Sequence, residues 1–520
     1  MRSSRVPQAL TCGLAALLVA GCTGDPEPPA PSPEAEPAPV PTSFGGEAPP
    51  GVEGEVLRYL HGDSAGTHDI LDDPLGVRIS PVGDAFLVSS GGEDRHLLHD
   101  AATGDTLWEG EARFRGFDSG SDGARVLSMA DPDGAPFVLD SRGEPVWEPE
   151  EEGDAYLDGL GVRRPGGWSA EEPHGEFTLL DADGGELWSY DFAAPEEPEE
   201  PEEAEGSEAP DDPSGDGDDP DSDDDAGEPA LGVPVAARND LVLLASGGAS
   251  LHARSVGADT AGEELWTVDG EDGELGLDTS GLVLPPQVMG FYPLPDPEGG
   301  DGGGGADATD GATDGTDATD EETEADGGAD DAVMLLRWAQ PEAPSTLSAH
   351  DPETGDLLWT LEEPGTNPAA GAFDPAGTVG NLYDAATGTL LLPQASGEAT
   401  TVAVDLAEGE VLWGLEQEDG SISPAFAFDG LVYGDSRGNT GADEQLVLDA
   451  VTMDVVGDDL SAYVEGITDS GYAILVHDRQ RFVYGPTPED APGEDPSATP
   501  TDGPGGEPDT DPAESPGDGG

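Results

Sequence analysis

The sequence of 520 residues contains no lysine, and all 17 of its basic residues are arginines, against 114 aspartates and glutamates. The formal net charge of −97 would repel the phosphates of DNA and RNA, so nucleic acid is excluded as a partner. The same charge attracts cations and basic protein surfaces. Without lysine, the phosphate-binding G-x-x-x-x-G-K-[ST] loop cannot occur.

Cysteine is almost absent as well. The only two cysteines are Cys12 and Cys22, and Cys12 lies in an N-terminal segment that we expect to be removed. The mature chain then has no pair of thiols for a disulfide, a cysteine metal site or dithiol redox chemistry. A chain of this size must therefore rely on an apolar core.

The N-terminus has the features of a targeting segment. Arg2 and Arg5 precede an apolar run that is too short to span a membrane and ends in "LVAGC". This ending resembles the bacterial lipoprotein signal, which implies a signal peptide over 1–21 and a diacylated Cys22. An ordinary signal peptide cleaved nearby is the alternative. The resemblance predicts a protein anchored by lipid to the outer face of the bacterial cytoplasmic membrane.

Four segments have too few apolar residues to offset the entropy of ordering, and we expect them to be disordered. The acidic insert at 193–230 holds 18 acids and no base, and that at 296–331 holds 14 acids and no base. The insert sequence "DGDDPDSDDD" lacks the register of a calcium-binding EF-hand loop. The other two segments are a proline-rich acidic linker at 22–54 and an acidic tail at 486–520.

The remaining sequence, 55–485, is β-rich by pattern. Short apolar runs such as "AFLVSS", "LVLLAS", "VMLLRW" and "TVAVDL" alternate with Gly, Asp and Pro. Helical periodicity hardly occurs outside the signal segment. The pattern predicts an all-β fold.

A repeated phrase runs through this region, exemplified by "DAATGDTLW" and "DPETGDLLW". Six of the eight tryptophans end such a phrase, and in each a glycine lies four residues earlier. Asp caps a turn through its side chain, and Gly takes the positive φ that other residues resist, so the phrase predicts a hairpin turn feeding a strand. The tryptophans are Trp108, Trp147, Trp188, Trp266, Trp359 and Trp413, and the glycines are Gly104, Gly143, Gly184, Gly262, Gly355 and Gly409.

The spacing of the phrase indicates a repeat architecture. Successive tryptophans are 39, 41, 78, 93 and 54 residues apart, and the two longest intervals contain the acidic inserts. A repeat of about 40 to 50 residues with several strands is typical of a β-propeller. We predict eight blades, with seven as the alternative, including a degenerate copy at 449–456. Strands at 472–485 should close the ring with N-terminal ones such as "LGVRIS".

These phrases resemble the tryptophan-docking motif of pyrroloquinoline-quinone-type β-propellers. The resemblance implies that each Trp packs between neighbouring blades against the Gly of an adjacent turn. Many members of that family are scaffolds that bind no quinone. A quinone-dependent dehydrogenase would need a calcium or lanthanide site and often a vicinal disulfide, which the mature chain cannot form. We therefore predict neither a quinone cofactor nor a metal.

No catalytic constellation stands out. His96 and His99 are three apart on an expected strand and so face opposite sides, and we interpret the histidines as isolated polar surface residues. Trp168 and Trp338 fall outside the repeat and are weak candidates for exposed binding residues. H-E-x-x-H and G-x-S-x-G do not occur.

Together these features predict a non-catalytic cell-surface lipoprotein. Its propeller would be a binding scaffold for an envelope protein or a cell-wall polymer. A quinone-dependent dehydrogenase is the alternative. The arginine-only composition, rich in Ala, Gly and Asp, suggests an actinobacterial source.

A Cys22→Ser substitution tests the anchor. With no thiol to acylate, the protein should incorporate no palmitate label and should move from the membrane fraction to the medium, because the acyl chains supply the binding energy. The matched control is Cys12→Ser, which should leave both readouts unchanged. Membrane retention of unlabelled Cys22→Ser protein would contradict lipidation.

Overall fold

The computed structural model describes residues 44–60, 69–151, 153–169, 171–194, 231–246, 248–277, 285–295, 332–339, 344–365, 381–394, 399–416, 422–437 and 443–486. The predicted signal peptide, Cys22, most of the linker, the insert at 296–331 and nearly all of the insert at 193–230 and of the tail lie outside the described residues. Regular structure other than strands is limited, within these ranges, to two short 3-10 turns, η1 (Asp69–Asp72) and η2 (Gly273–Leu275). No helix in this part of the chain is long and apolar enough to cross a membrane.

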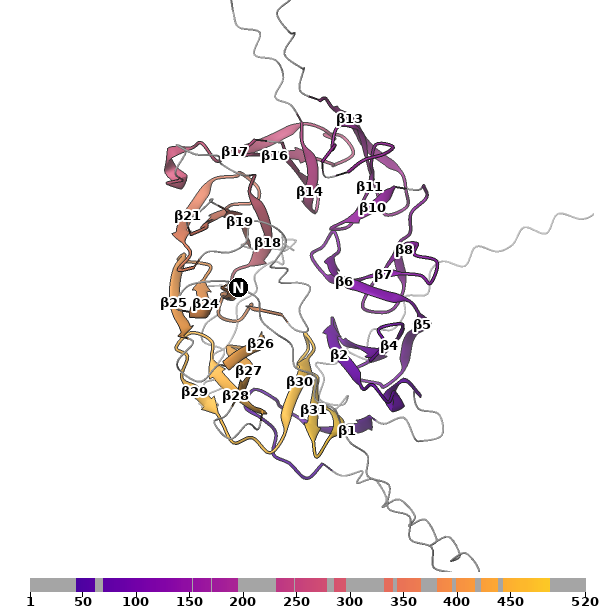
Figure 1. Cartoon of the computed structure of the whole chain (residues 1–520), viewed down its shortest axis with the longest axis vertical. Coiled ribbons are helices and arrows are strands. Elements are labelled where there is room, and N and C mark those ends of the chain that lie inside the picture. The colour runs from indigo at the N-terminus through magenta and orange to yellow at the C-terminus, as the bar shows by residue number, and fades with distance from the viewer. Residues whose placement is uncertain are drawn as a thin grey trace, which may run out of the picture. The chain divides into compact units, whose positions relative to one another are not determined.

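The chain forms eight four-stranded antiparallel sheets arranged around a ring, which confirms the eight-bladed β-propeller (Figure 1). The first four sheets follow the chain in order. Blade 1 is β2 (Val77–Val82), β3 (Ala85–Ser90), β4 (Arg95–Asp100) and β5 (Thr106–Glu111), and blade 2 is β6 (Arg113–Ser119), β7 (Arg125–Ala130), β8 (Pro136–Leu139) and β9 (Pro145–Trp147). Blade 3 is β10 (Asp154–Leu157), β11 (Leu160–Arg163), β12 (Gly175–Leu180) and β13 (Glu186–Phe192), and blade 4 is β14 (Val233–Arg238), β15 (Leu241–Ala245), β16 (Ser250–Ser255) and β17 (Glu264–Asp269).

The second half of the ring continues the same order until the last blade. Blade 5 is β18 (Gln287–Pro293), β19 (Ala332–Trp338), β20 (Thr346–His350) and β21 (Leu357–Glu362), and blade 6 is β22 (Tyr383–Asp384), β23 (Thr389–Pro393), β24 (Ala399–Asp405) and β25 (Glu410–Glu416). Blade 7 is β26 (Ile422–Phe428), β27 (Leu431–Arg437), β28 (Asp443–Asp449) and β29 (Val455–Gly457). Blade 8 is β30 (Tyr463–Ile467), β31 (Ala473–His477), β32 (Gln480–Gly485) and β1 (Glu55–Leu60).

The ring is closed by β1, which pairs with β32 as the fourth strand of blade 8. The expectation that "LGVRIS" would join the C-terminal strands is wrong, because Val77–Val82 is β2, the first strand of blade 1. An earlier segment was needed, since β2 is already committed to its own sheet. The first acidic insert connects blades 3 and 4, whereas the second connects β18 and β19 within blade 5.

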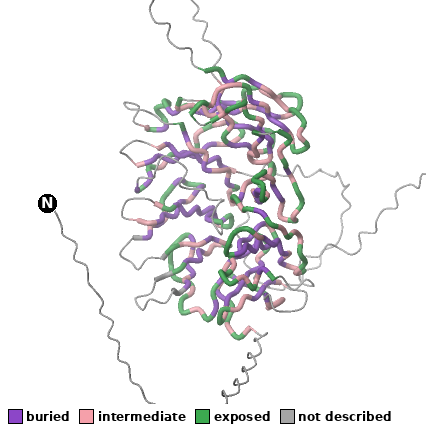
Figure 2. The backbone as a smooth tube through the Cα atoms, turned by 45° about the vertical axis from the view of Figure 1, so that its right-hand side comes forward, coloured by how far each residue is buried: buried purple, intermediate pink, exposed green. Residues whose placement is uncertain are grey.

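The hydrophobic clusters combine residues of neighbouring blades, so the core lies between successive sheets rather than at one centre, and Figure 2 shows the buried stretches distributed along the chain. Alternate residues of β19 show why its run "VMLLRW" is apolar throughout. Val333 and Leu335 pack against blade 6, while Met334 and Leu336 pack against blade 4. Burying each such side chain contributes roughly 1.5–3 kcal/mol, so the inner strands lose stability if either face becomes polar.

The hairpin turns between third and fourth strands have the predicted backbone. All six repeat glycines have positive φ, between 70° at Gly409 and 86° at Gly104. The Asp351 carboxylate accepts hydrogen bonds from the backbone N–H groups of Glu353 and Thr354, at 2.7 and 3.0 Å. In the phrase around Gly262, however, Ser255 rather than Asp259 holds the turn, accepting from the Gly257 N–H at 3.2 Å. The loop is longer there, which displaces the aspartate.

Gly355→Ala should destabilise the protein through two effects. A Cβ at Gly355 would lie 2.7 Å from the Trp266 ring, and alanine resists the φ of 76°. We expect a loss of about 2–4 kcal/mol, measured by thermal or denaturant unfolding. The matched control is Gly134→Ala, where φ is 95° but no atom lies within 4 Å of the added Cβ, so only the backbone cost of about 1 kcal/mol applies. Equal losses in the two variants would contradict a role for the indole contact.

Candidate functional site

The predicted docking tryptophans all lie on the fourth strands of blades 1 to 6. Four of their side chains meet the turn glycine of the next blade. A Cβ at that glycine would lie 2.6 Å from Trp108 at Gly143, 2.6 Å from Trp188 at Gly262, 2.7 Å from Trp266 at Gly355 and 2.4 Å from Trp359 at Gly409. No Cβ fits in that space, so glycine is required both by the turn conformation and by the packing of the tryptophan.

Three of the indoles also donate a hydrogen bond across the junction. Trp266 Nε1 donates to the Pro352 carbonyl at 3.1 Å, and Trp359 Nε1 donates to the Leu406 carbonyl at 2.9 Å. Trp413 Nε1 donates to the Ala450 carbonyl at 2.8 Å. Each acceptor is the residue after the turn aspartate. In the degenerate blade 7 turn, Met453 adopts a φ of 63° at the position where the other turns have glycine.

Two repeat glycines have different neighbours. A Cβ on Gly184 would meet the Glu150 carboxylate at 2.8 Å, and Trp147 instead packs beside Tyr156 with ring centroids 5.8 Å apart. A Cβ on Gly104 would meet the Arg58 guanidinium at 3.0 Å.

Arg58 takes the place of an indole at the junction of blades 8 and 1. It lies on β1, the fourth strand of blade 8, and its guanidinium donates to the backbone carbonyls of Asp100, Ala101 and Ala102. Ala101 follows the turn aspartate, so it is the same acceptor that tryptophans use elsewhere. Arg58 Nε also donates to His99 Nε2 at 3.2 Å. A search for tryptophans misses this role, but "EGEVLR" at 53–58 repeats "EGEVLW" at 408–413, with Arg58 at the tryptophan position, four residues after Gly54.

The junction between blades 7 and 8 has no indole, because Gly457 stands four residues after Met453. The N-terminal segment covers this position: Pro50 lies 2.8 Å from the Cβ position of Gly457, and Tyr433 donates to the Pro50 carbonyl at 2.7 Å. Phe44 packs edge-on against Phe482, with centroids 5.4 Å apart. Residues 44–54, which the sequence analysis assigns to the disordered linker, thus pack against the propeller.

Four of the six histidines that the structure describes are not surface residues, contrary to the interpretation from sequence. His96, His99, His252 and His350 are all buried. His350 Nδ1 donates to the Gly355 carbonyl at 3.0 Å, so its Nε2 accepts from Ser348 at 2.9 Å. Burial lowers the pKa of His96 and of His350, so both rings remain neutral at pH 7. These rings serve as internal hydrogen-bonding groups.

Trp338 is likewise not exposed, and its selection as a surface candidate is wrong. It is among the largest fully buried side chains and donates through Nε1 to Ser348 at 2.8 Å. It sits on the central strand β19, where both faces are covered. Trp168 is half-buried, with the Arg164 guanidinium 4.3 Å from its ring centroid.

Two carboxyl groups meet where blades 2 and 3 adjoin. Desolvation and the neighbouring Asp158 raise the pKa of Asp118 to about 7, and desolvation also raises the pKa of Asp158. Asp158 accepts from the Ala237 N–H of blade 4 at 3.0 Å, and Tyr156 donates to the Ser119 carbonyl at 2.9 Å. The pair joins three blades near the ends of their first strands, β6, β10 and β14.

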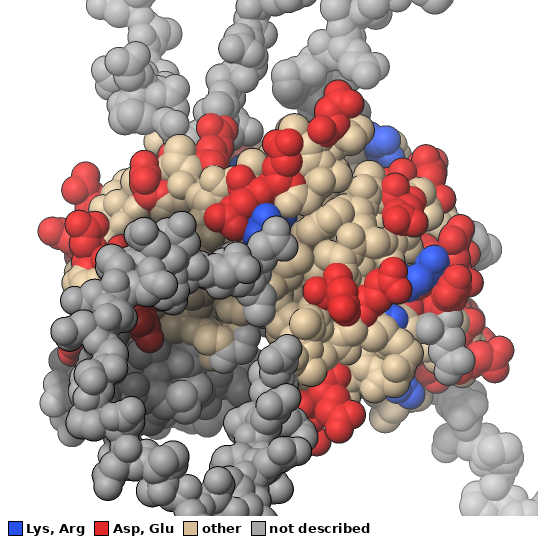
Figure 3. Space-filling model, turned by 90° about the horizontal axis from the view of Figure 1, so that it is seen from above, with Lys and Arg blue, Asp and Glu red and all other residues tan. Residues whose placement is uncertain are grey.

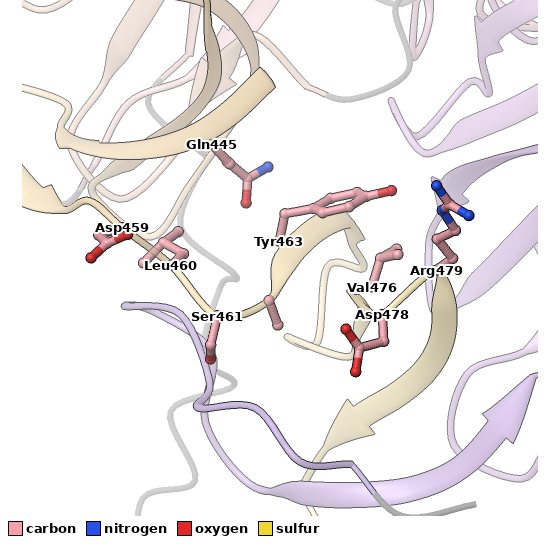
Figure 4. A pocket seen from close by; sticks show the side chains of 9 residues that line it. Gln445, Asp459, Leu460, Ser461, Tyr463, Val476, Asp478 and Arg479 are labelled. Atoms are coloured by element: carbon pink, nitrogen blue, oxygen red, sulfur yellow. The ribbon is translucent and has the colours of Figure 1, made fainter. Parts of the chain in front are cut away.

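A pocket of about 340 Å³ lies at the boundary of blades 7 and 8 (Figure 4). Asp459 and Leu460 line one side, Asp478 and Arg479 the other, and Tyr463 lies between them. Both amide atoms of Gln445 are bonded to the backbone of Val464, at 2.7 and 2.8 Å, so this side chain joins the two blades. The pocket is not signalled by any motif in the sequence.

The surface is strongly acidic, with scattered arginines (Figure 3). Some arginines are internal: Arg337 forms a two-pronged ion pair with Glu363, at 2.8 and 2.9 Å, and both side chains are buried. Among the described residues, no three His, Cys, Asp or Glu side chains are grouped as metal ligands.

The molecule is thus an eight-bladed β-propeller. No protein-family model matches the sequence, and no curated protein does. Similar solved structures include BamB from Moraxella catarrhalis (13% identity, TM-score 0.35, 78% of this chain and 96% of that chain). Sqt1 from Saccharomyces cerevisiae is similar as well (11%, TM-score 0.34, 83% and 98%). So is the quinohemoprotein alcohol dehydrogenase ADHIIG from Pseudomonas putida (14%, TM-score 0.33, 78% and 69%). Likeness at this level concerns the propeller fold, and membership of the tryptophan-docking family stays a prediction.

The Asp118 carboxyl group predicts a pH dependence of stability. Its pKa is about 7 in the folded protein against 3.8 ordinarily, so the folded state binds more protons between these values. The free energy of unfolding therefore falls as pH rises from about 4 to 7. Asp118→Asn should be more stable than wild type at pH 8, by about 1 kcal/mol after allowing for solvent screening, and nearly equal to it at pH 4.5.

Thermal unfolding across this pH range measures the difference between variant and wild type. Asp133→Asn is the matched control, because Asp133 is an exposed loop residue. It should change the unfolding temperature less than Asp118→Asn does at pH 8. An Asp118→Asn curve parallel to wild type would refute the raised pKa.

Proposed function

We propose that the protein is a non-catalytic binding scaffold that Cys22 anchors at the cell surface. The propeller would hold an envelope protein or a cell-wall polymer. The main support is the way in which histidine, arginine and glutamate side chains of the described residues are used. The buried histidines and the Arg337–Glu363 pair are engaged in hydrogen bonds or an ion pair inside the propeller, and Arg58 joins blades 8 and 1. Groups committed in this way are not available to a substrate.

The acidic surface favours a basic partner. A net charge of −97 attracts positively charged surfaces over a distance and accelerates encounter. Between a protein and a polymer, this charge favours a basic envelope protein, since many surface polymers carry negative charge themselves.

Crosslinking in intact cells tests the scaffold. A scaffold should yield one dominant crosslinked partner, identified by mass spectrometry, with crosslinks on exposed residues of the propeller. The Cys22→Ser protein, secreted into the medium, is the control and should lose this partner because the two no longer share a membrane. Failure of wild type to crosslink any envelope component would refute the proposal.

The dehydrogenase alternative has its own assay. The purified protein, incubated with the quinone and calcium, should show neither a bound chromophore nor dye reduction with alcohols or sugars. Turnover that depends on both additions would replace the scaffold with an enzyme.

A further inference from the structure

The outer edge of blade 7 carries an unusual concentration of exposed apolar side chains. Ten large hydrophobic residues are exposed in the part of the chain that the structure describes, and five of them lie between 451 and 463. Four belong to the turn before β29 and to β29 itself, and these are 36% to 57% exposed: Val451, Met453, Val455 and Val456. We name these four residues the blade 7 strip. Apolar side chains gathered at one place on a soluble surface indicate an interaction site.

The backbone beneath the strip has no strand on its outer side at Val455 and Val456, while the N-terminal segment contacts the next residue, Gly457, through Pro50. β29 is the edge strand of its sheet and has only β28 as a neighbour. It pairs with β28 at two positions, Gly457 with Val447 and Val455 with Leu448, around a bulge. The outward N–H and C=O groups of an edge strand can pair with an extended peptide. On blades 1 to 6 the fourth strand carries a docking tryptophan, whereas β29 has Gly457 at that position.

The pocket described above continues the strip along the chain. Residues 458–462 link β29 to Tyr463, whose ring is 45% exposed and lies in the pocket (Figure 4). Two carboxylates, Asp459 and Asp478, line this pocket against the single guanidinium of Arg479. An aromatic face beside excess carboxylate suits a lysine or arginine side chain.

The charge around the blade 7 strip also favours a basic ligand. Residues 449–459 contain four aspartates and no base. An acidic or neutral peptide would gain only the apolar contacts, whereas a basic one also gains from these carboxylates.

We propose that the blade 7 strip and the adjacent pocket bind an extended, basic segment of a partner protein. The segment adds a strand to β29, places its apolar side chains on the valines and directs one basic side chain into the pocket. This inference rests on the proposed scaffold function and specifies the surface and the partner's chemistry.

The test uses a fluorescent peptide of alternating valine and lysine with the full-length protein, followed by fluorescence polarisation. Val455→Thr with Val456→Thr should weaken binding by about tenfold or more, because threonine keeps strand propensity but loses apolar contact. Tyr463→Leu should weaken it by about threefold through loss of the cation–π contact. Leu265→Thr, at an equally exposed position on blade 4, is the matched control and should change binding by less than about twofold. Unfolding temperatures verify that all variants are folded.

Two further peptides test whether binding reflects only electrostatic attraction to the acidic surface. A serine–lysine peptide should bind weakly, and equally to wild type, the double threonine variant and Leu265→Thr, and a valine–glutamate peptide should not bind. The inference is overturned if wild type does not bind the valine–lysine peptide, or if the double threonine variant binds it as tightly as wild type. Its failure is distinct from that of the scaffold: a partner crosslinked only to other blades would retain the scaffold and refute this site.

Discussion

The ring depends above all on one contact, made at four of its eight junctions, in which a tryptophan of one blade rests on a left-handed glycine in the turn of the next. A turn with positive φ excludes most residues, and the indole excludes any Cβ, so both requirements select glycine. The contact also fixes the four-residue spacing from glycine to tryptophan, because the turn and the fourth strand of each blade must both reach a blade junction. A large ring buried at successive junctions supplies both area and orientation. Successive sheets are therefore held at a repeated angle that brings the eighth back to the first.

The repeat changes at blade 8, where the ring closes. The last sheet is completed by β1, so the chain ends replace the turn on which blade 7 would otherwise dock. Gly457 stands in place of an indole, and Pro50 with its neighbours fills the space. On the other side of the same blade, Arg58 reaches the carbonyl that an indole would use. A guanidinium offers several donors in one plane and so can satisfy three carbonyls together.

Polar groups inside the ring also stabilise the propeller. Trp338 donates to Ser348, Ser348 donates to His350, and His350 donates to the Gly355 carbonyl, so a chain of hydrogen bonds runs from a central strand to a docking turn. Blade 7, which lacks the indole, has the most apolar edge, and this is where the proposed partner segment binds.

The sequence by itself determined the all-β propeller and the turn conformation and favoured eight blades over seven, because the Asp–Gly–Trp spacing is set locally by a hairpin and repeats along the chain. The tryptophan pattern did not identify the strand that closes the ring, since β1 carries Arg58 where the repeat has tryptophan, and only three-dimensional pairing shows that β1 joins β32. Nor did it distinguish buried from exposed polar residues. His96 and Trp338 carry no repeat signature, and His99, like His350, directly precedes a turn aspartate; their burial depends on packing in the folded ring rather than on adjacent residues. The contacts of Arg58 and the pocket at blades 7 and 8 likewise form only when segments far apart in the chain meet as the ring closes.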